Sequence, residues 1–388
     1  MNLDGRLSFA VRWDGTSVQA VGVESTRAVG ASRVLEGKAP AEVARLVPML
    51  FSLCGRAQGV AALRAWEAAM EVDTAPGAET AREWVVAAEA VLETLWRLLL
   101  DWPEALGEAP AAAEYVAWRR RLLDLADGVT QSEGWRTPGA PVACSMGDLH
   151  RAGSDLWRYL GREVLGMDPA AWEDADLSAL GSWWKGGATG TARILARLFA
   201  GEGLAGSSDV ALMEGAWNEV PWRQVLERTL HETGFAARPD WLGEPRETGA
   251  LARMRNRPAV AEALARHGNC VAVRVLARLA ETVALARGLA GASAEERVYG
   301  MGVAPGTGMA WVETSRGVLT HALVLREGRV SRYRMLAPTE WNFHPDGPFV
   351  RGLRGQKAGS GSEVERRLQL HAMALDPCVA FDWRVGHA

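Results

Sequence analysis

The sequence predicts an α+β fold, a mostly helical bundle with small β elements from both ends of the chain. Three observations support this prediction. Apolar and polar residues alternate over positions 7–13, apolar residues recur every three or four positions over 78–289, and the short-period pattern returns after residue 297. No internal repeat interrupts this order, so we expect a single domain over residues 1–388.

Residues 1–30 predict a β-hairpin. Leu7, Phe9, Val11 and Trp13 alternate with smaller or polar residues, and Asp14-Gly15 can adopt the positive φ angles of a tight turn. The sheet should therefore begin at the N-terminus.

Residues 40–290 predict the helical bundle. A helix begins near Pro40 and ends near Trp66, with an interruption at Cys54-Gly55, and an apolar stripe then runs from Trp84 to Leu99. Further helices are expected over residues 111–126, 153–165, 189–198, 221–231 and 258–289, of which the last is the longest.

The C-terminal third predicts a β segment over residues 297–340 and a final helix with a cysteine-bearing tail over 363–388. Strands are expected at 311–313, 318–325 and 330–336. The glycines of 300–306 superficially resemble a dinucleotide-binding loop, but their spacing is wrong and no helix follows, so this stretch predicts a turn.

Composition excludes several function classes. The 388 residues include 43 Lys+Arg and 47 Asp+Glu, a net charge of -4, which is too balanced for a nucleic-acid or polybasic membrane binder. The N-terminus lacks a basic region followed by an apolar one, and the four cysteines lie far apart, so we expect a cytoplasmic protein. The 17 tryptophans outnumber the 4 tyrosines and 7 phenylalanines together, which favours codon bias over a dedicated aromatic surface.

Generic chemical motifs are absent from the sequence. It has no Walker A loop, no CxxC pair and no HExxH, and the seven histidines show no metal-ligand spacing. We expect most of these histidines at the surface or at helix ends.

The flanks of two cysteines carry the informative signal. Arg64-Ala65-Trp66-Glu67 follows Cys54, and Asp376-Pro377 precedes Cys378. These segments resemble the large subunit of nickel–iron hydrogenases, which has a Cys-Gly-x-Cys-Pro-x-x-His motif before an Arg-Ala-x-Glu helix and ends in Asp-Pro-Cys-x-x-Cys. On this alignment, Cys54 matches the second N-terminal cysteine and Cys378 the first C-terminal one.

Four more segments resemble the same family in the same order along the chain: residues 3–7, 247–254, 313–321 and 337–342. Each match is weak alone, but together they extend over nearly the whole sequence. The resemblance implies a hydrogenase-large-subunit-like fold.

The departures from the family change the expected chemistry. Phe51 and Phe381 stand at the other two cysteine positions, and Gln58 stands at the family's histidine. Thiolates suit both metals of the catalytic family, so losing two of four removes most of the nickel coordination. The resemblance therefore implies no nickel, no hydrogen turnover and no enzyme.

Half of the cysteines being replaced makes the chain similar to the HupK/HoxV-type accessory proteins of hydrogenase maturation. That similarity implies a scaffold that transiently holds or assembles the Fe(CN)2(CO) fragment and passes it to the catalytic large subunit. It also implies partners of the HypC/HypD type and possibly the hydrogenase large subunit itself, with no nucleic acid and no membrane span.

The resemblance assigns the site. Cys54 and Cys378 would be the metal ligands, with Gln58 and Arg316 lining the bound fragment. Arg316 matches an arginine on the cyanide side, where its directed donors suit cyanide nitrogen; a structural salt bridge is the equal alternative. Cys378 matches a nickel-terminal position, so either the iron lies nearer to it or it serves entry and handover.

Other residues receive structural expectations. Asp4 matches a family glutamate and is expected to be a turn or cap residue, while Cys144 and Cys270 are expected to pack. Two other functions remain open. One is a metal-free protein–protein interaction relative of the large subunit. The other is a thiol redox protein using Cys54 and Cys378, which needs Cα atoms about 4.4–6.8 Å apart.

Overall fold

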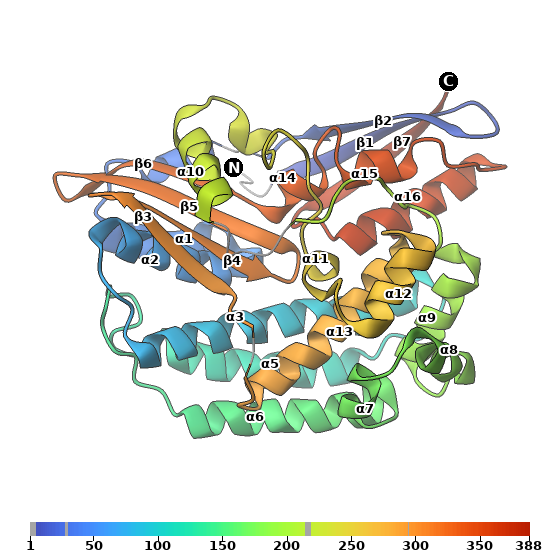
Figure 1. The fold of residues 1–388 in the computed structure, drawn as a ribbon, viewed down its shortest axis with the longest axis horizontal. Helices are drawn as coiled ribbons and strands as arrows, with labels where there is room; N and C mark the ends of the chain where they lie inside the picture. The colour runs from blue at the N-terminus through green and yellow to red at the C-terminus, as the bar shows by residue number, and fades with distance from the viewer. Residues whose placement is uncertain (1–4, 28–29, 214–218, 294) are drawn as a thin grey trace.

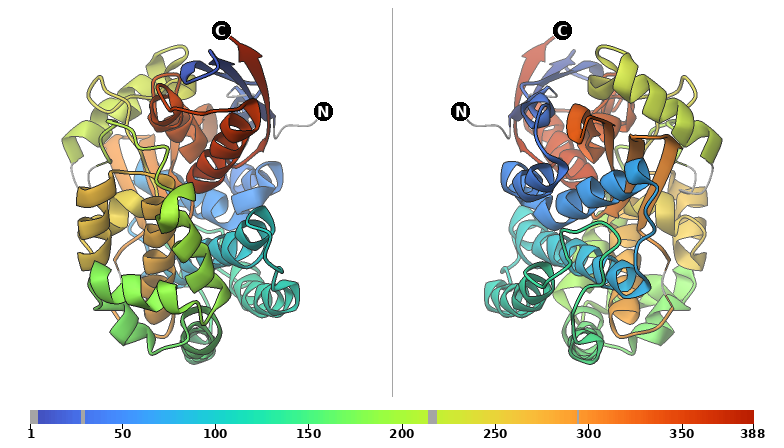
Figure 2. Two further views of the ribbon diagram at one scale, coloured as in Figure 1. Left: turned by 90° about the vertical axis from the view of Figure 1, so that its right-hand side faces the viewer. Right: turned by 90° about the vertical axis from the view of Figure 1, so that its left-hand side faces the viewer.

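The computed structural model describes residues 5–27, 30–213, 219–293 and 295–388, so Asp4 lies outside the described residues. The predicted hairpin is confirmed by β1 (Arg6–Trp13) and β2 (Val18–Ser25), which pair antiparallel. A third strand, β7 (Ala380–His387), pairs parallel to β1, with Trp383 opposite Phe9. The two ends of the chain thus share one sheet, seen as the blue and red strands in Figures 1 and 2.

The second sheet has four antiparallel strands in sequence order: β3 (Val298–Ala304), β4 (Thr307–Thr314), β5 (Gly317–Arg326) and β6 (Arg329–Leu336). The predicted turn at 300–306 is wrong in its first part, which lies in β3. A Cβ at Gly302 would lie 2.6 Å from the carbonyl oxygen of Ala68, and one at Gly308 would lie 2.4 Å from that of Ala65. These glycines therefore allow α2 to lie directly on the sheet.

The helices fill residues 40–289 and recur near the C-terminus. Figure 1 shows the long helices α3, α5, α6 and α13 below the two sheets. Short 3-10 turns cover Ala31–Leu35, Ser52–Cys54 and Phe235–Ala237, and π-helical turns cover Arg97–Asp101, Leu160–Leu165 and Leu198–Glu202. The helices are α1 (Pro40–Leu50), α2 (Gly55–Met70), α3 (Pro76–Trp96), α4 (Trp102–Ala105), α5 (Ala112–Thr130), α6 (Met146–Tyr159), α7 (Pro169–Glu173), α8 (Leu177–Gly186), α9 (Gly190–Arg197), α10 (Glu219–His231), α11 (Ala250–Met254), α12 (Pro258–His267), α13 (Val271–Leu289), α14 (Pro338–Asn342), α15 (Pro348–Leu353) and α16 (Gly361–Leu375).

Two helix predictions have instructive outcomes. The break expected at Cys54-Gly55 is confirmed, because α1 ends at Leu50 and α2 begins at Gly55. The single helix expected over 258–289 is wrong. The chain leaves helical geometry at Gly268, where φ is +66°, and α13 starts again at Val271. The apolar pattern of residues 258–289 is continuous because α12 and α13 contribute to the same core.

Many tryptophans belong to the interior. Trp222 stacks on Trp311 with ring centroids 4.7 Å apart, and Trp241 meets Trp222 edge-on at 4.9 Å. These rings pack beside the four-stranded sheet together with Trp341. Since aromatic rings bury large areas, this part of the tryptophan excess is accounted for by packing.

Three of the segments that resemble the hydrogenase family, 247–254, 313–321 and 337–342, meet in space. The side-chain oxygen of Asn342 accepts from the backbone N–H of Thr248 at 2.9 Å, and its nitrogen donates to the carbonyl of Arg316 at 3.2 Å. The hydroxyl of Thr248 accepts from the N–H of Val318 at 3.0 Å. Gly317, with φ +130°, leaves room for Thr248, since a Cβ there would lie 2.5 Å from its methyl group. Together these hydrogen bonds fix the backbone of Arg316.

Candidate functional site

The two cysteines singled out by the sequence lie at junctions between elements. Cys54 ends the short turn before α2, and Cys378 lies between α16 and β7. Both are half-buried, and the four cysteines, all within the described residues, are free thiols. The two sulfurs are close enough that a charge on Cys378 contributes to the raised pKa of Cys54. The fold thus brings together residues 324 positions apart in the chain.

Cys54 lies in a setting that favours a neutral thiol. Burial raises the pKa of Cys54 to about 12, and the charge of Glu89 adds to this effect. The Glu89 carboxylate accepts backbone N–H groups of Arg56 at 3.0 Å and Ala57 at 2.9 Å, at the first turn of α2. Burial raises the pKa of Glu89 to about 7. A bound metal ion would displace the Cys54 proton.

Gln58 connects Cys54 to a buried hydrogen-bond chain. Its Nε2 donates to the Cys54 sulfur at 3.5 Å, and its Oε1 lies 2.9 Å from Nε2 of His321. Burial lowers the pKa of His321 to about 3, so the ring is neutral. We assign its proton to Nε2, since Nδ1 lies 2.5 Å from the Tyr333 hydroxyl, which donates to it. The chain therefore orients the Gln58 amide with a donor toward sulfur.

Two of the seven histidines are exceptions to the expectation that most lie at the surface or at helix ends. His321 and His371 are both fully buried. His321 lies on β5, an inner strand that α2 covers, and His371 lies on α16 with Nδ1 3.2 Å from Arg274. The sequence around each of these two histidines does not indicate burial, because the elements that cover them come from distant parts of the chain.

Cys378 is contacted by two donors. The hydroxyl of Thr339 donates to its sulfur at 3.0 Å and accepts from its backbone N–H at 3.1 Å. A guanidinium nitrogen of Arg27 also donates to this sulfur, and Nε of Arg27 lies 2.8 Å from a carboxylate oxygen of Glu340. Sequence reasoning missed Arg27, which belongs to none of the matching segments. Thr339 was identifiable from its place in the 337–342 segment.

Arg316 occupies a buried network of charges. Its side chain is 3% exposed, pairs with Glu93 and lies 3.5 Å from Asp376. Burial alone would lower the pKa of Arg316, but the charges of Asp376 and Glu93 raise it above the ordinary value. Asp376 also pairs with Arg97 at 2.7 Å and Arg278 at 3.2 Å. The salt bridge that was the alternative role for Arg316 is therefore present, and it accounts for part of the surroundings of this side chain.

One donor of Arg316 remains available. Its Nη1 is buried and has no hydrogen-bond partner among the described residues. Leaving such a donor unpaired costs about 1–3 kcal/mol. Arg82 and Arg297 also bury nitrogens without a hydrogen bond, but the charges of Cys54 and Cys378 act on Arg316, as they do on Arg27, whose Nε lies 2.8 Å from Glu340. An acceptor bound beside the two sulfurs would satisfy Nη1 of Arg316.

The protein supplies few metal ligands. Within the described parts of the chain, no group of three or more His, Cys, Asp or Glu side chains is arranged to hold a metal ion. At the vacated cysteine positions, Phe381 packs on Phe9 with centroids 5.7 Å apart, and Phe51 joins an apolar cluster with Val47. Two sulfurs with nearby donors therefore suit a metal that arrives with ligands of its own.

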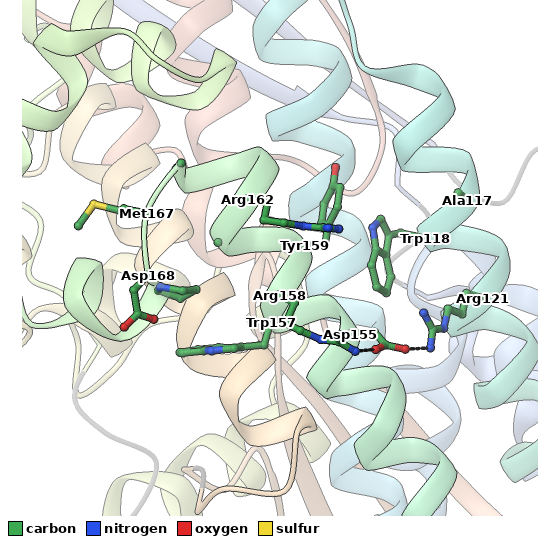
Figure 3. Close-up of a pocket in the computed structure, with 13 residues that line it drawn as sticks. Ala117, Trp118, Arg121, Asp155, Trp157, Arg158, Tyr159, Arg162, Met167 and Asp168 are labelled. Carbon is green, nitrogen blue, oxygen red and sulfur yellow. Dashed lines mark hydrogen bonds and ion pairs between the residues drawn. The ribbon is translucent and has the colours of Figure 1, made fainter.

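A groove away from the two cysteines has a different character. About 1040 Å³ in volume, it is formed by α5, α6, α7 and the turn between α6 and α7. Figure 3 shows Asp155 between Arg121 and Arg158, with which it forms ion pairs. Its described lining residues include neither cysteine nor histidine, and Met167 is the one sulfur-bearing residue among them, so it offers no thiolate for a soft metal.

The family described as Nickel-dependent hydrogenase matches residues 263–380. Over nearly the full chain, the protein is 30% identical to the hydrogenase expression/formation protein HoxV of Cupriavidus necator, with 98% of this chain and 95% of the relative covered. It is 32% identical to HupK of Rhizobium leguminosarum bv. viciae, covering 95% and 93%. The chain belongs to the HupK/HoxV family of hydrogenase expression/formation proteins. The resemblance drawn from the sequence motifs is therefore confirmed.

Solved structures confirm the fold class. The Ni-Fe-Se hydrogenase from Desulfomicrobium baculatum superposes with a TM-score of 0.65 at 14% identity, covering 95% of each chain. The enzyme from D. vulgaris Hildenborough also gives 0.65, at 11% identity over 94% of each. This HupK/HoxV protein thus has a hydrogenase large-subunit fold. In the described residues, no helix is long and apolar enough to cross a membrane.

Proposed function

We propose that this protein is a non-enzymatic scaffold of hydrogenase maturation that holds or assembles the Fe(CN)2(CO) fragment and passes it to the catalytic large subunit. The names of its relatives support a role in hydrogenase formation. The observation that supports the finer role is the convergence of Cys54, Cys378 and a buried Arg316 donor that has no acceptor among the described residues.

The chemistry of the three residues matches the fragment as cargo. Iron carrying two cyanides and one carbonyl has three strong ligands already, so the protein need add only a few, and thiolate sulfur suits iron. Arg316 would donate to a cyanide nitrogen with a charge that cannot be lost by deprotonation. Gln58 would donate to the Cys54 sulfur and orient it.

Weak binding of the iron fragment would allow its delivery to the large subunit. A site with two sulfurs binds iron less tightly than one in which four thiolates bridge two metals, and release is a requirement for a donor. Phe51 and Phe381 offer no ligands, so no nickel is expected and hydrogen turnover should be absent. Cys378, between α16 and β7, would be the second ligand, with the iron lying nearer to it than in the catalytic family.

The same chemistry defines the partners and the setting. We infer that HypC/HypD-type assembly factors supply or build the fragment and that the hydrogenase large subunit receives it. We place these steps in the cytoplasm, where thiols remain reduced.

The proposal is tested by infrared spectroscopy. The protein is co-expressed with the cyanide and carbonyl synthesis machinery and purified without oxygen, and its bands for metal-bound cyanide and carbonyl are recorded. The bands should be present in the wild type, lost in Cys54→Ala and Cys378→Ala, and retained in Cys144→Ala, which alters another half-buried cysteine.

Other outcomes contradict the proposal in distinguishable ways. Iron-free protein that still co-purifies with the assembly factors would indicate a metal-free interaction relative. A reversible disulfide between Cys54 and Cys378 without iron would indicate a thiol redox protein. A loaded protein that keeps its bands when mixed with metal-free large subunit would contradict the transfer step.

A further inference from the structure

We infer that Arg27 determines metal specificity at this site, because its guanidinium on Cys378 disfavours bare divalent cations and favours a cyanide-bearing iron fragment, which becomes anionic once both thiolates bind it. The inference rests on the proposed function and deepens it. Arg27 follows β2, outside every segment that resembles the hydrogenase family.

The guanidinium of Arg27 is held in place from two sides. One nitrogen donates to the Cys378 sulfur, and Nε lies 2.8 Å from Glu340. Glu340 and Thr339 are neighbours on α14, and Thr339 contacts the same sulfur at 3.0 Å. The side chains of Arg27 and Glu340 are only 13% and 8% exposed, so neither is free to move into solvent without losing this contact.

Without a cation beside them, two cysteines would also bind other abundant metal ions. Zinc and copper bind soft thiolates strongly, so two nearby sulfurs do not by themselves select iron. Arg27 keeps its charge at all physiological pH values. A divalent ion approaching Cys378 therefore meets a fixed positive charge at the sulfur, in a half-buried setting where screening is weak.

Charge counting separates the two guests. Zn²⁺ bound by two thiolates is a neutral group, and the guanidiniums of Arg27 and Arg316 gain nothing from it. Fe²⁺ with two cyanides is already neutral, so two thiolates make the assembly doubly negative. The charges of Cys54 and Cys378 act on both arginines, so the two guanidiniums would stabilise the second assembly and not the first.

The test measures zinc binding to metal-free protein by competition with a chromogenic chelator. Arg27→Gln should raise the zinc affinity by about tenfold or more, since it removes a like charge next to the ligand. Arg27→Lys, which keeps the charge, should stay near the wild type. Arg6→Gln is the matched control, because Arg6 pairs with Asp382 on the surface of the same sheet.

A double variant separates two explanations of tighter zinc binding. Losing Arg27 frees Glu340, whose carboxylate is itself a zinc ligand type. In Arg27→Gln/Glu340→Gln the gain should persist, and adding Cys54→Ala should abolish it. Unchanged zinc affinity in Arg27→Gln, or a gain that disappears with Glu340, would overturn the inference.

Infrared spectra of protein loaded in the cell give the second readout. Arg27→Gln should retain less fragment, with shifted cyanide bands. Identical band positions and iron content in the wild type and Arg27→Gln would overturn the inference while the proposed function stands. Absence of bands in the wild type would refute the proposed function, whereas the zinc comparison would still decide whether Arg27 excludes bare cations.

Discussion

Two buried arginines, Arg274 and Arg316, differ in whether the structure satisfies their hydrogen-bond donors. Both side chains are 3% exposed. Nε and Nη2 of Arg274 each lie 2.8 Å from Glu247, and Nη1 donates to the carbonyl of Gly206 at 3.0 Å. Arg316 pairs with Glu93 and Asp376 but has an Nη1 without an acceptor in the described chain. Hydrogen-bond satisfaction, not burial, separates the two arginines.

The largest effect should come from breaking the saturated pair. Arg274→Met should lower the free energy of unfolding by about 3–5 kcal/mol, because the Glu247 carboxylate stays buried without its cation. Denaturation by urea measures this loss. A smaller loss than that of Arg316→Met, measured in parallel, would contradict the contrast between the two arginines.

A second buried ion-pair cluster, formed by Glu281 with Arg253 and Arg297, gives a pH-dependent effect. Burial would raise the pKa of Glu281, but Arg253 and Arg297 lower it to about 2. The unfolded state, with its ordinary pKa of 4.5, therefore binds a proton before the folded state does as pH falls. This contribution is fully present above pH 4.5 and is lost between 4.5 and about 2.

The prediction compares Glu281→Gln with the wild type across that range. The variant should be about 3 kcal/mol less stable at pH 7, and the difference should shrink below pH 4.5. Urea denaturation at a series of pH values checks it. A difference that does not change with pH would mean that ionic pairing of Glu281 contributes nothing.

Arg316→Met should cost less stability and more function. We expect a loss of about 2 kcal/mol, since Arg97 and Arg278 still neutralise Asp376 and the removed Nη1 had no acceptor among the described residues. Iron retention and the cyanide bands should fall sharply. Arg274→Met, where it stays folded, should keep those bands, and the opposite assignment would break the comparison.

The smallest effect is expected from Gln58, which contacts the Cys54 sulfur. Gln58→Leu should lower stability by about 1 kcal/mol, because Nε2 of His321 loses its acceptor. Loss of the donor to Cys54 should also shift the cyanide bands without abolishing them. Tyr333→Phe serves as a control, since it removes a bond to the far side of His321 and leaves Gln58 in place.

Local pattern predicted some elements and not others. The hairpin at the N-terminus and the break at Cys54-Gly55 follow from alternation and from helix-breaking residues, which act within a few positions. Strand β7 is not among the predicted elements, although Phe381, Trp383 and Val385 alternate, because its pairing partner β1 lies at the other end of the chain. Strand β3 is not among the predicted strands because its glycines are required by the close approach of α2. No residue near β3 in the sequence indicates that approach.

The sequence by itself determined the family, the α+β class and the two cysteines, because these depend on ordered motifs that can be seen one segment at a time. Tertiary structure alone decided which donors face each sulfur. Arg27 is 351 positions from Cys378, and Gln58 is 263 from His321. Contacts over such separations form only when the two ends of the chain share a sheet and α2 lies on the other, and no local periodicity encodes them.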